Sequence, residues 1–320
     1  MSRLPLACHL PPADGRPPSG ALLYARYVQQ RLRESGRVVP APDAAAEAIL
    51  SLDGRFRAGR GQPTVTAVFD LGHLTARRAY PAPLWLRQNW RVASAARRSD
   101  RILVASTALR AGLAAHLGVK ESRVIVLEPL PASALTRAPL AKVKRLRADL
   151  GLPERYFVFV GSRGKRKNLA LLGRAWREVC SRLDDSVGLV LAGPERGGLP
   201  GLSRVLDIGY VGGENLPALL SGAIAYLNPS LYEGSGIGAQ EAMACGTPAI
   251  VAPTGALPRA VDAAGIVLDA FDAAAWADAL QALATRPALR AELSRTALRL
   301  TAERRAHPPD LVPLLGALGA

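Results

Sequence analysis

Two glutamates bracket a glycine-rich turn in the second half of the chain. Glu233 precedes the turn GSGIG, and Glu241 lies near the start of the helix-forming run that follows it. Backbone N–H groups left free at a helix N-terminus bind anions, and the helix dipole favours negative charge there. Carboxylates instead accept hydrogen bonds from hydroxyl groups. This arrangement therefore suits a ligand in which a diphosphate joins a sugar to a ribose.

A second turn carries a dense group of positive charges. The segment GSRGKRKN, residues 161–168, follows the apolar run Tyr156–Val160 and holds four cations within five residues. The glycines predict a turn that leads into a helix. Cations in such a turn would neutralise a diphosphate.

The glutamates lie within a longer string that resembles a known family. PSLYEGSGIG followed by EAMACGTP is similar to the E-x7-E signature of retaining family-4 (group 1) glycosyltransferases, which have the GT-B fold. The resemblance runs from about Pro63 to the late two hundreds and is specific from Tyr156 to Gly265. It implies that Glu233 holds hydroxyls of the transferred sugar and that Glu241 binds the ribose of a nucleotide-sugar donor.

The resemblance also implies the contacts to the donor diphosphate. Lys167 matches the lysine of the family pattern, whereas the family arginine corresponds to either Arg163 or Arg166. Further contacts are expected from the backbone at Ser235, Gly236 and Ile237, from Val211 in the turn that reads the nucleotide base, and from Gly20 in the first half.

The first half departs from the family pattern at the position that, in relatives, lies beside the reacting sugar. Relatives often read His-Asp-Leu at the end of the strand Thr64–Phe69, with the histidine in the cleft. Here Phe69 stands in that place, Asp70 follows it, and the nearest histidine is His73. Either His73 takes over the role or Asp70 becomes the polar group at the strand end, so both are candidate catalytic residues.

The elements that must position these residues follow an alternating pattern. In the second half, short apolar runs alternate with helix-forming runs, which predicts a parallel sheet with ligands at the carboxyl ends of its strands. With the resemblance, the prediction is an α/β fold of two Rossmann-like doubly wound domains facing a cleft. The sequence also predicts a helix over Ala41–Leu50 and places Thr107 as the cap of another helix.

The length of 320 residues suits two domains. We expect an acceptor-side domain over residues 1–135, a nucleotide-sugar-binding domain over 136–305, and a tail over 306–320 that packs back on the core. No apolar run is long enough to predict a membrane span. Cys8, Cys180 and Cys245 match no metal spacing and favour a reducing, cytoplasmic location.

The positive charge is concentrated in the first half. Residues 1–150 hold 24 Lys and Arg against 10 Asp and Glu, whereas residues 151–320 hold 17 against 16. Such a surface favours an acidic, phosphorylated or lipid-linked acceptor, or peripheral contact with the inner face of a membrane. No nucleic-acid module is recognisable, and aromatic residues for base stacking are few.

The predicted function is therefore metal-independent, retaining transfer of a hexose to an acceptor hydroxyl, in the synthesis of cell-envelope polysaccharide or glycolipid. No Asp-x-Asp motif follows a suitable strand, so neither a metal nor a cofactor is expected besides the nucleotide-sugar co-substrate. The main alternative is an inactive GT-B partner or scaffold subunit, suggested by Phe69 and by Arg259, which stands where relatives often have an acid. The chain lacks the set of catalytic acids and bases that a sugar-nucleotide epimerase requires. The alternative of a nucleic-acid-binding protein is supported by the positive charge alone. The sequence does not identify the transferred sugar, the nucleotide base or the acceptor.

Overall fold

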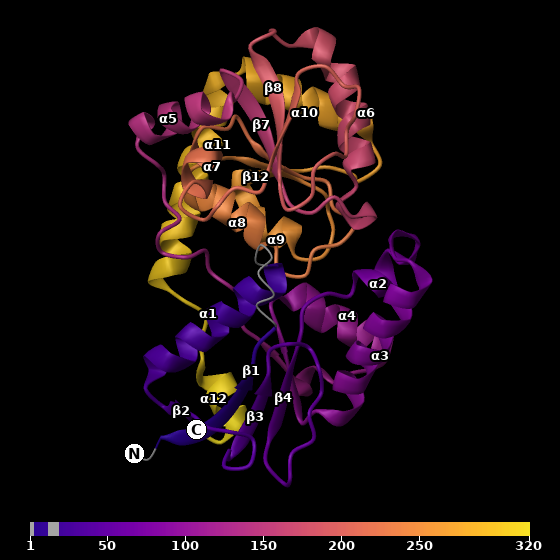
Figure 1. Ribbon diagram of the computed structural model, residues 1–320, viewed down its shortest axis with the longest axis vertical. Coiled ribbons are helices and arrows are strands. Elements are labelled where there is room, and N and C mark those ends of the chain that lie inside the picture. The colour runs from indigo at the N-terminus through magenta and orange to yellow at the C-terminus, as the bar shows by residue number, and fades with distance from the viewer. Residues whose placement is uncertain (1–2, 12–18) are drawn as a thin grey trace. The chain divides into compact units, whose positions relative to one another are not determined.

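The computed structural model describes residues 3–11 and 19–320, and the chain forms two compact units (Figure 1). The first unit combines Met1–Pro129 with Pro308–Ala320, and the second spans Leu130–His307. The sequence predicted the domain boundary between residues 135 and 136, within a proline-rich stretch. Residues 308–320, most of the predicted tail, belong to the first unit.

The first unit is built on a parallel six-stranded sheet, with the strand order β2-β1-β3-β4-β5-β6. The strand order changes direction between β1 and β3, as in other doubly wound sheets. The strands are β1 (Leu4–His9), β2 (Val38–Pro40), β3 (Ala48–Ser51), β4 (Thr64–Val68), β5 (Arg101–Val104) and β6 (Val124–Val126), and the α-helices are α1 (Gly20–Ser35), α2 (Gly72–Thr75), α3 (Ala82–Arg98), α4 (Thr107–Leu117) and α12 (Val312–Leu318).

The helix predicted over Ala41–Leu50 is wrong. The end of this segment is strand β3, whose four residues are all buried between β1 and β4. The alanines favour a helix locally, but pairing with two strands outweighs that weak preference. The cap of α4 is also one residue earlier than predicted, because the Ser106 hydroxyl accepts the Leu109 N–H at 3.2 Å.

The second unit contains another parallel six-stranded sheet, with the order β9-β8-β7-β10-β11-β12. This is the Rossmann strand order, and it confirms the α/β prediction. The strands are β7 (Arg155–Val160), β8 (Val187–Ala192), β9 (Val205–Gly209), β10 (Tyr226–Asn228), β11 (Ala249–Val251) and β12 (Gly265–Val267), and the α-helices are α5 (Leu140–Leu150), α6 (Leu169–Val179), α7 (Leu216–Ser221), α8 (Ile237–Ala244), α9 (Leu257–Val261), α10 (Ala273–Thr285) and α11 (Pro287–Ala306).

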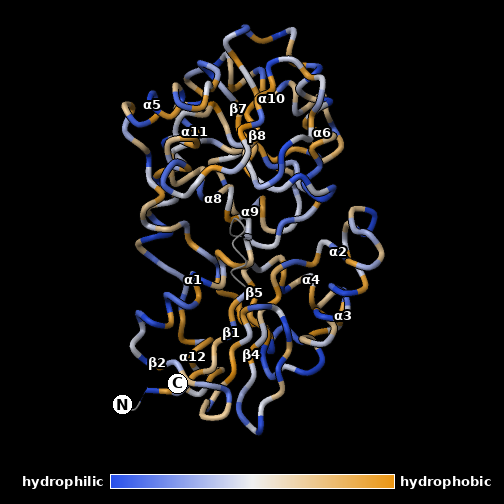
Figure 2. The backbone as a smooth tube through the Cα atoms, in the orientation of Figure 1, coloured by the Kyte–Doolittle hydropathy of each residue, from blue (hydrophilic) through white to orange (hydrophobic). Residues whose placement is uncertain are grey.

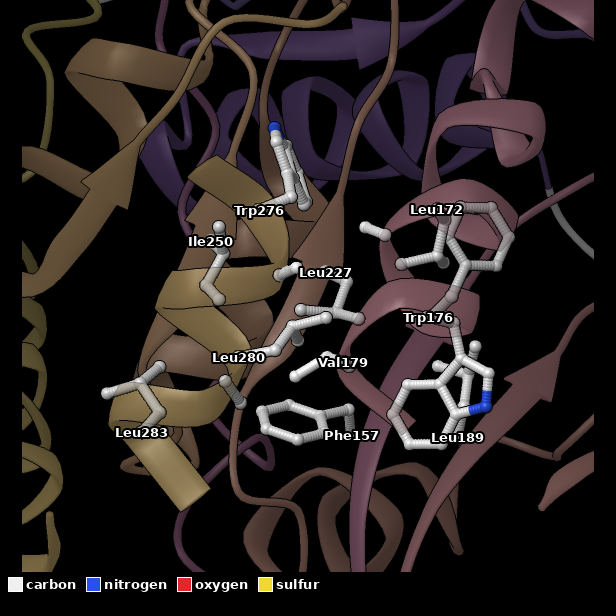
Figure 3. Close-up of a cluster of buried hydrophobic side chains, with 14 of the residues drawn as sticks. Phe157, Leu172, Trp176, Val179, Leu189, Leu227, Ile250, Trp276, Leu280 and Leu283 are labelled. Carbon is white, nitrogen blue, oxygen red and sulfur yellow. The ribbon is translucent and has the colours of Figure 1, made fainter. Parts of the chain in front are cut away.

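Helices α6 and α10 pack together against one face of this sheet and bury two tryptophans (Figure 3). Trp176 and Trp276 are at most 1% exposed. Each indole N–H still finds an acceptor, the carbonyl of Ser203 at 3.0 Å and that of Asp269 at 2.9 Å. Apolar residues also follow the strands of both sheets (Figure 2). The loops at the strand ends are therefore held on a packed base.

The C-terminal helix α12 completes the first unit. It contacts β3 and β4 and buries Leu314, Leu315 and Leu318. The tail thus adds apolar area to the first sheet. Among the described residues, no helix is both long and apolar enough to cross a bilayer.

Candidate active site

The reversal of strand order in the second unit lies between β7 and β10, which pair through Val158 and Tyr226. Ligands of such sheets bind beyond the carboxyl ends of the strands at this point. The loop after β7 carries the cationic turn, and the loop after β10 carries Glu233. The fold therefore brings together two motifs that are 66 residues apart in the chain.

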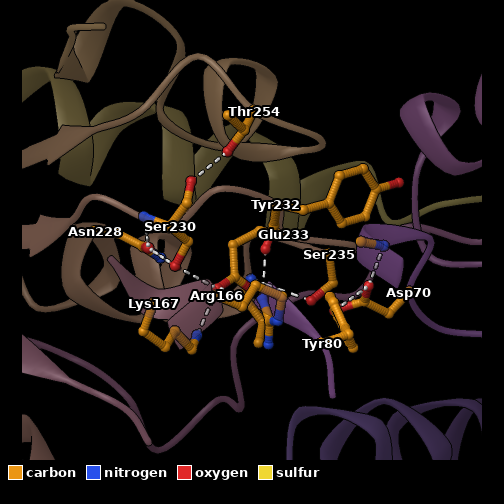
Figure 4. Close-up of polar contacts among 12 residues, drawn as sticks. Asp70, Tyr80, Arg166, Lys167, Asn228, Ser230, Tyr232, Glu233, Ser235 and Thr254 are labelled. Carbon is orange, nitrogen blue, oxygen red and sulfur yellow. Dashed lines mark hydrogen bonds and ion pairs between the residues drawn. The ribbon is translucent and has the colours of Figure 1, made fainter. Parts of the chain in front are cut away.

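Glu233 forms ion pairs with both cations that end the turn (Figure 4). The Lys167 Nζ lies 2.5 Å from Glu233 Oε1, and a guanidinium nitrogen of Arg166 lies 3.2 Å from the same oxygen. Burial alone would raise the pKa of Glu233, but the charges of Lys167 and Arg166 outweigh it, together with hydrogen bonds from Lys167 and Ser230, and lower the pKa to about 2. Glu233 is therefore a carboxylate at neutral pH.

The two oxygens of Glu233 have different surroundings. Oε1 takes the contacts from Lys167 and Arg166 and a hydrogen bond from the Ser230 hydroxyl at 2.9 Å. Oε2 accepts no hydrogen bond from any residue that the structure describes. The first oxygen fixes the orientation of the carboxylate, and the second can accept hydroxyl donors.

Sequence reasoning did not select Ser230, which helps to orient Glu233. Its side chain is fully buried, and its hydroxyl lies 2.5 Å from Asn228 Oδ1. Its carbonyl accepts a hydrogen bond from the Thr254 hydroxyl at 2.6 Å. The only sequence signal was its place three residues before Glu233 in the string PSLYE.

Asn168 is a second positioning residue that the sequence did not reveal. It adopts the left-handed conformation, with φ of 53°, directly before α6. Its amide donates to the carbonyls of Pro229 at 3.1 Å and Ala270 at 2.8 Å. It thereby joins the loops that follow β7, β10 and β12, which keeps the cationic turn beside Glu233.

The structure separates the two arginines between which the sequence left the choice open. The guanidinium of Arg163 donates to the carbonyls of Gly161 at 2.8 Å and Gly197 at 2.9 Å and pairs with Asp207 at 3.2 Å. Its side chain is only 8% exposed. Arg163 therefore ties the loops after β7 and β8 to strand β9, whereas Arg166 lies beside Glu233.

The sequence predicts a helix over Ala239–Cys245, and helix α8 begins two residues earlier, at Ile237. Gly236 caps it in the left-handed conformation, with φ of 66°. A Cβ at Gly236 would lie 2.6 Å from the Ala260 Cβ, so a side chain is excluded there. The Ser235 hydroxyl accepts the Ile237 N–H at 3.4 Å. Ser235, Gly236 and Ile237 thus form the start of the helix after Glu233.

Glu241 lies on α8 without an ion pair or hydrogen bond from any described side chain. Burial raises its pKa to about 7. Because this folded-state pKa exceeds the ordinary value of 4.5, the folded chain holds the proton more tightly than the unfolded chain. Ionisation of Glu241 therefore lowers the free energy of unfolding progressively as the pH rises from about 4.5 to 7.

We expect Glu241→Gln to stabilise the protein at pH 8 by on the order of 1–3 kcal/mol and to change little at pH 5. Glutamine resembles the protonated acid, which predominates only at the lower pH. Urea unfolding at both pH values measures the effect, with the exposed Glu292→Gln as control. An equal effect of Glu241→Gln at the two pH values would contradict the raised pKa.

Gly255 supports the main chain of Glu233. It has a φ of +56°, and a Cβ there would lie 2.1 Å from the Glu233 carbonyl oxygen. The next residue, Ala256, donates its N–H to that oxygen at 2.8 Å. The segment after β11 is therefore in close backbone contact with the loop that carries Glu233.

We expect Gly255→Ala to lower the free energy of unfolding by about 2 kcal/mol or more, since it adds a backbone clash to the strain of a positive φ. Gly201→Ala is the matched control, because Gly201 has a φ of +73° but open space around it. The control should lose about 1 kcal/mol. Equal losses in urea unfolding would show that the contact with Glu233 is not tight.

The turn after β9 contains Val211, the predicted base contact. Gly209 ends this strand with a φ of 70°, and its carbonyl accepts the Gly193 N–H at 2.9 Å. Val211 is partly buried. It lies at the carboxyl edge of the second sheet, where the Rossmann order puts ligand contacts.

Three predicted site residues belong to the first unit. Asp70 accepts the Gly72 N–H at 2.5 Å and lies 3.4 Å from the Tyr80 hydroxyl, so it supports the start of α2. His73 lies within α2, where burial lowers its pKa to about 4 and Nε2 has no hydrogen-bond partner among the described residues. Gly20 is the exposed first residue of α1.

Phe69, which replaces the usual histidine, packs within the same unit. Its ring lies edge-on to Tyr24 of α1, with the centroids 6.0 Å apart. The Tyr24 hydroxyl donates to the Val104 carbonyl at 3.1 Å. Phe69 thus joins a packed aromatic pair, and the neutral, buried His73 is the polar ring nearest to it in sequence.

Comparison with known proteins finds a family match within the second unit. Residues 154–286 match the family described as glycosyl transferases group 1. The chain is 34% identical over 208 residues to D-inositol 3-phosphate glycosyltransferase of Salinispora tropica, covering 56% of this chain and 42% of that protein. It is 35% identical over 132 residues to O-antigen chain mannosyltransferase B of Escherichia coli, covering 38% of this chain and 34% of that protein. The matches span less than half the length of these relatives.

Solved structures share the whole fold at low sequence identity. HepE of Anabaena, in complex with UDP-glucose, has a TM-score of 0.74 at 16% identity and covers 99% of this chain and 98% of its own. WaaG, a glycosyltransferase involved in lipopolysaccharide biosynthesis, has a TM-score of 0.67 at 16% identity and covers 94% and 84%. Residues 154–286 therefore resemble the glycosyl transferases group 1 family, and the two parallel six-stranded sheets match the GT-B fold of these solved structures.

Proposed function

We propose that this protein is a retaining, metal-independent glycosyltransferase that moves a hexose from a nucleotide-diphosphate sugar to an acceptor hydroxyl. The observation that carries the proposal is the Glu233 carboxylate, with one oxygen fixed by Lys167 and Arg166 and the other available. The names of the relatives agree with it, since one is an inositol phosphate glycosyltransferase and another a mannosyltransferase.

In this proposal the second unit binds the donor. Lys167 and Arg166 bind the diphosphate, with the start of α8 at Ser235, Gly236 and Ile237 as further donors. Glu241 accepts hydrogen bonds from the ribose, and the backbone at Val211 contacts the base. Arg163 holds the loops in place. From the first unit, Gly20 is proposed at the donor phosphates, and Asp70 and His73 at the reacting sugar and the acceptor.

The reaction breaks the bond between the anomeric carbon and the diphosphate oxygen, and the bonding electrons leave with the diphosphate. Lys167, Arg166 and the helix N-terminus stabilise this charge as it develops. The acceptor oxygen forms the new bond on the face from which the diphosphate departs, so the anomeric configuration is retained. The proton of the acceptor hydroxyl passes to an oxygen of the leaving phosphate.

Glu233 serves as a hydrogen-bond acceptor for the sugar in this scheme. A carboxylate with a pKa of about 2 is a weak base at neutral pH. Its Oε1 is engaged by Lys167, Arg166 and Ser230, and this leaves Oε2 for the sugar hydroxyls. Positive charge that develops on the ring in an oxocarbenium-like transition state is stabilised by the nearby carboxylate.

The basic first half suits an acidic, phosphorylated or lipid-linked acceptor, and we place the reaction in cell-envelope polysaccharide or glycolipid synthesis at the cytoplasmic side. The second candidate is a catalytically inactive partner or scaffold subunit. It is favoured by Phe69, which occupies the place of the usual histidine and packs against Tyr24.

Release of nucleoside diphosphate from UDP- and GDP-hexoses tests the proposal. An active transferase releases one of them in the presence of acceptor, with and without EDTA, and the product keeps the anomeric configuration of the donor by NMR. Loss of activity with EDTA would contradict metal independence, and an inverted product would contradict retention. Binding of a donor without turnover over a range of envelope acceptors would favour the scaffold.

A further inference from the structure

Helix α3 of the first unit exposes two large apolar side chains. Leu86 is 60% exposed and Trp90 is 66% exposed. They are four residues apart and therefore lie on one stripe of the helix. Large side chains of this kind are normally turned into the core, so an exposed pair on one stripe indicates a surface that meets another apolar phase.

Arginines surround this stripe. Arg97 follows Trp90 by two helical turns, and Arg87 and Arg91 form the neighbouring stripe. Residues 54–99 contain nine arginines and one acid, Asp70. Among the described residues, none of Arg87, Arg91 and Arg97 takes part in an ion pair. Their charges are therefore free to act on a partner.

Two further arginines near α3 stack on aromatic rings. Arg77 stacks on the Trp85 ring with its guanidinium carbon 4.8 Å from the centroid, and Arg98 stacks on Phe56 at 4.4 Å. Burial, together with the charges of Arg55 and Arg87, lowers the pKa of Arg91, in keeping with cations gathered close together. Asp53, whose charge acts on Arg91, is engaged by both terminal nitrogens of Arg57, at 2.8 Å and 2.9 Å.

We propose that the α3 face formed by Leu86, Arg87, Trp90, Arg91 and Arg97 docks on an anionic lipid bilayer surface. Arginines attract anionic headgroups, while tryptophan and leucine enter the boundary between headgroups and acyl chains. An acidic protein or a nucleic acid would satisfy the arginines but leave Leu86 without an apolar partner. The chemistry of the whole face therefore favours lipid.

Sedimentation with vesicles tests the docking surface in the full chain without donor, so the result does not depend on the transferase proposal. The probes are vesicles of phosphatidylcholine alone and of three parts phosphatidylcholine to one part phosphatidylglycerol. We expect binding only to the second kind, weakened by salt. Failure to bind them, or equal binding to both, overturns the proposal.

Two double variants locate the surface. Arg87→Glu with Arg91→Glu should weaken binding by at least about thirtyfold, since each basic residue contributes roughly a factor of five near an anionic membrane. Leu86→Ser with Trp90→Ser should weaken it by about tenfold or more at unchanged charge. Arg286→Glu with Arg295→Glu, on exposed residues of the second unit, is the charge-matched control. Equal losses in the control, or full binding by either α3 variant, contradict this assignment; circular dichroism and thermal melting verify that each variant is folded.

Discussion

Lys167→Ala is expected to lower kcat/KM for the donor by at least about a hundredfold, because in the proposed reaction it removes a charge that stabilises the leaving diphosphate. Lys167 is the cation closest to Glu233, at 2.5 Å, and its side chain is 15% exposed. Arg166 keeps part of the positive charge, so the loss should be large but not total. Steady-state release of nucleoside diphosphate measures the effect.

Lys165→Ala is the matched control, since it removes the same charge from the same turn. Lys165 is exposed and forms no ion pair with any described residue. Its loss should change kcat/KM by less than about threefold, as expected for an exposed charge. Comparable losses in the two variants would mean that the turn acts through its total charge and not through the position of Lys167.

Glu233→Gln is expected to lower kcat by about a hundredfold or more while nucleoside diphosphate binds as tightly as before, or more tightly. The amide keeps the size of the side chain but removes the negative charge that the proposed function places beside the sugar. It also removes the ion pairs that Glu233 makes with Lys167 and Arg166, so the net positive charge that the turn presents to the diphosphate increases.

Calorimetric titration with the diphosphate, beside the kinetics, separates the two effects. Glu292→Gln, on the exposed surface of α11, controls for the loss of one carboxylate. Parallel losses of binding and turnover in Glu233→Gln would assign Glu233 a structural role in the loop. Unchanged turnover would remove it from the proposed chemistry altogether.

The fold of the second unit could be predicted from the sequence because the residues of each motif are contiguous in the chain. The segment from Pro229 to Gly238 indicates both the end of a strand and the approach to a helix. The structure starts β10 at Tyr226, three residues after the predicted strand start, and starts α8 at Ile237, two residues before the predicted helix. The cationic turn and Glu233 could be paired by reasoning that strand ends meet at one edge of a parallel sheet.

Contacts between distant segments could not be predicted in the same way. Arg163 and Arg166 look alike in sequence, and only the carbonyls of the loops after β7 and β8 distinguish them. Asn168 acts through Pro229 and Ala270, which are 61 and 102 residues away. In the first unit, the buried setting of β3 overrides the helix preference of its alanines, and this setting is invisible in the local sequence.

Thermal unfolding with uridine and guanosine diphosphates tests the central claim, that the reversal of strand order between β7 and β10 is a nucleotide-sugar site. At a hundred times its dissociation constant, a ligand adds about 2.7 kcal/mol of stability. The account predicts that one diphosphate stabilises the wild type and that Lys167→Ala loses most of this effect. Absence of stabilisation by either nucleotide, or equal stabilisation of Lys167→Ala, would contradict it.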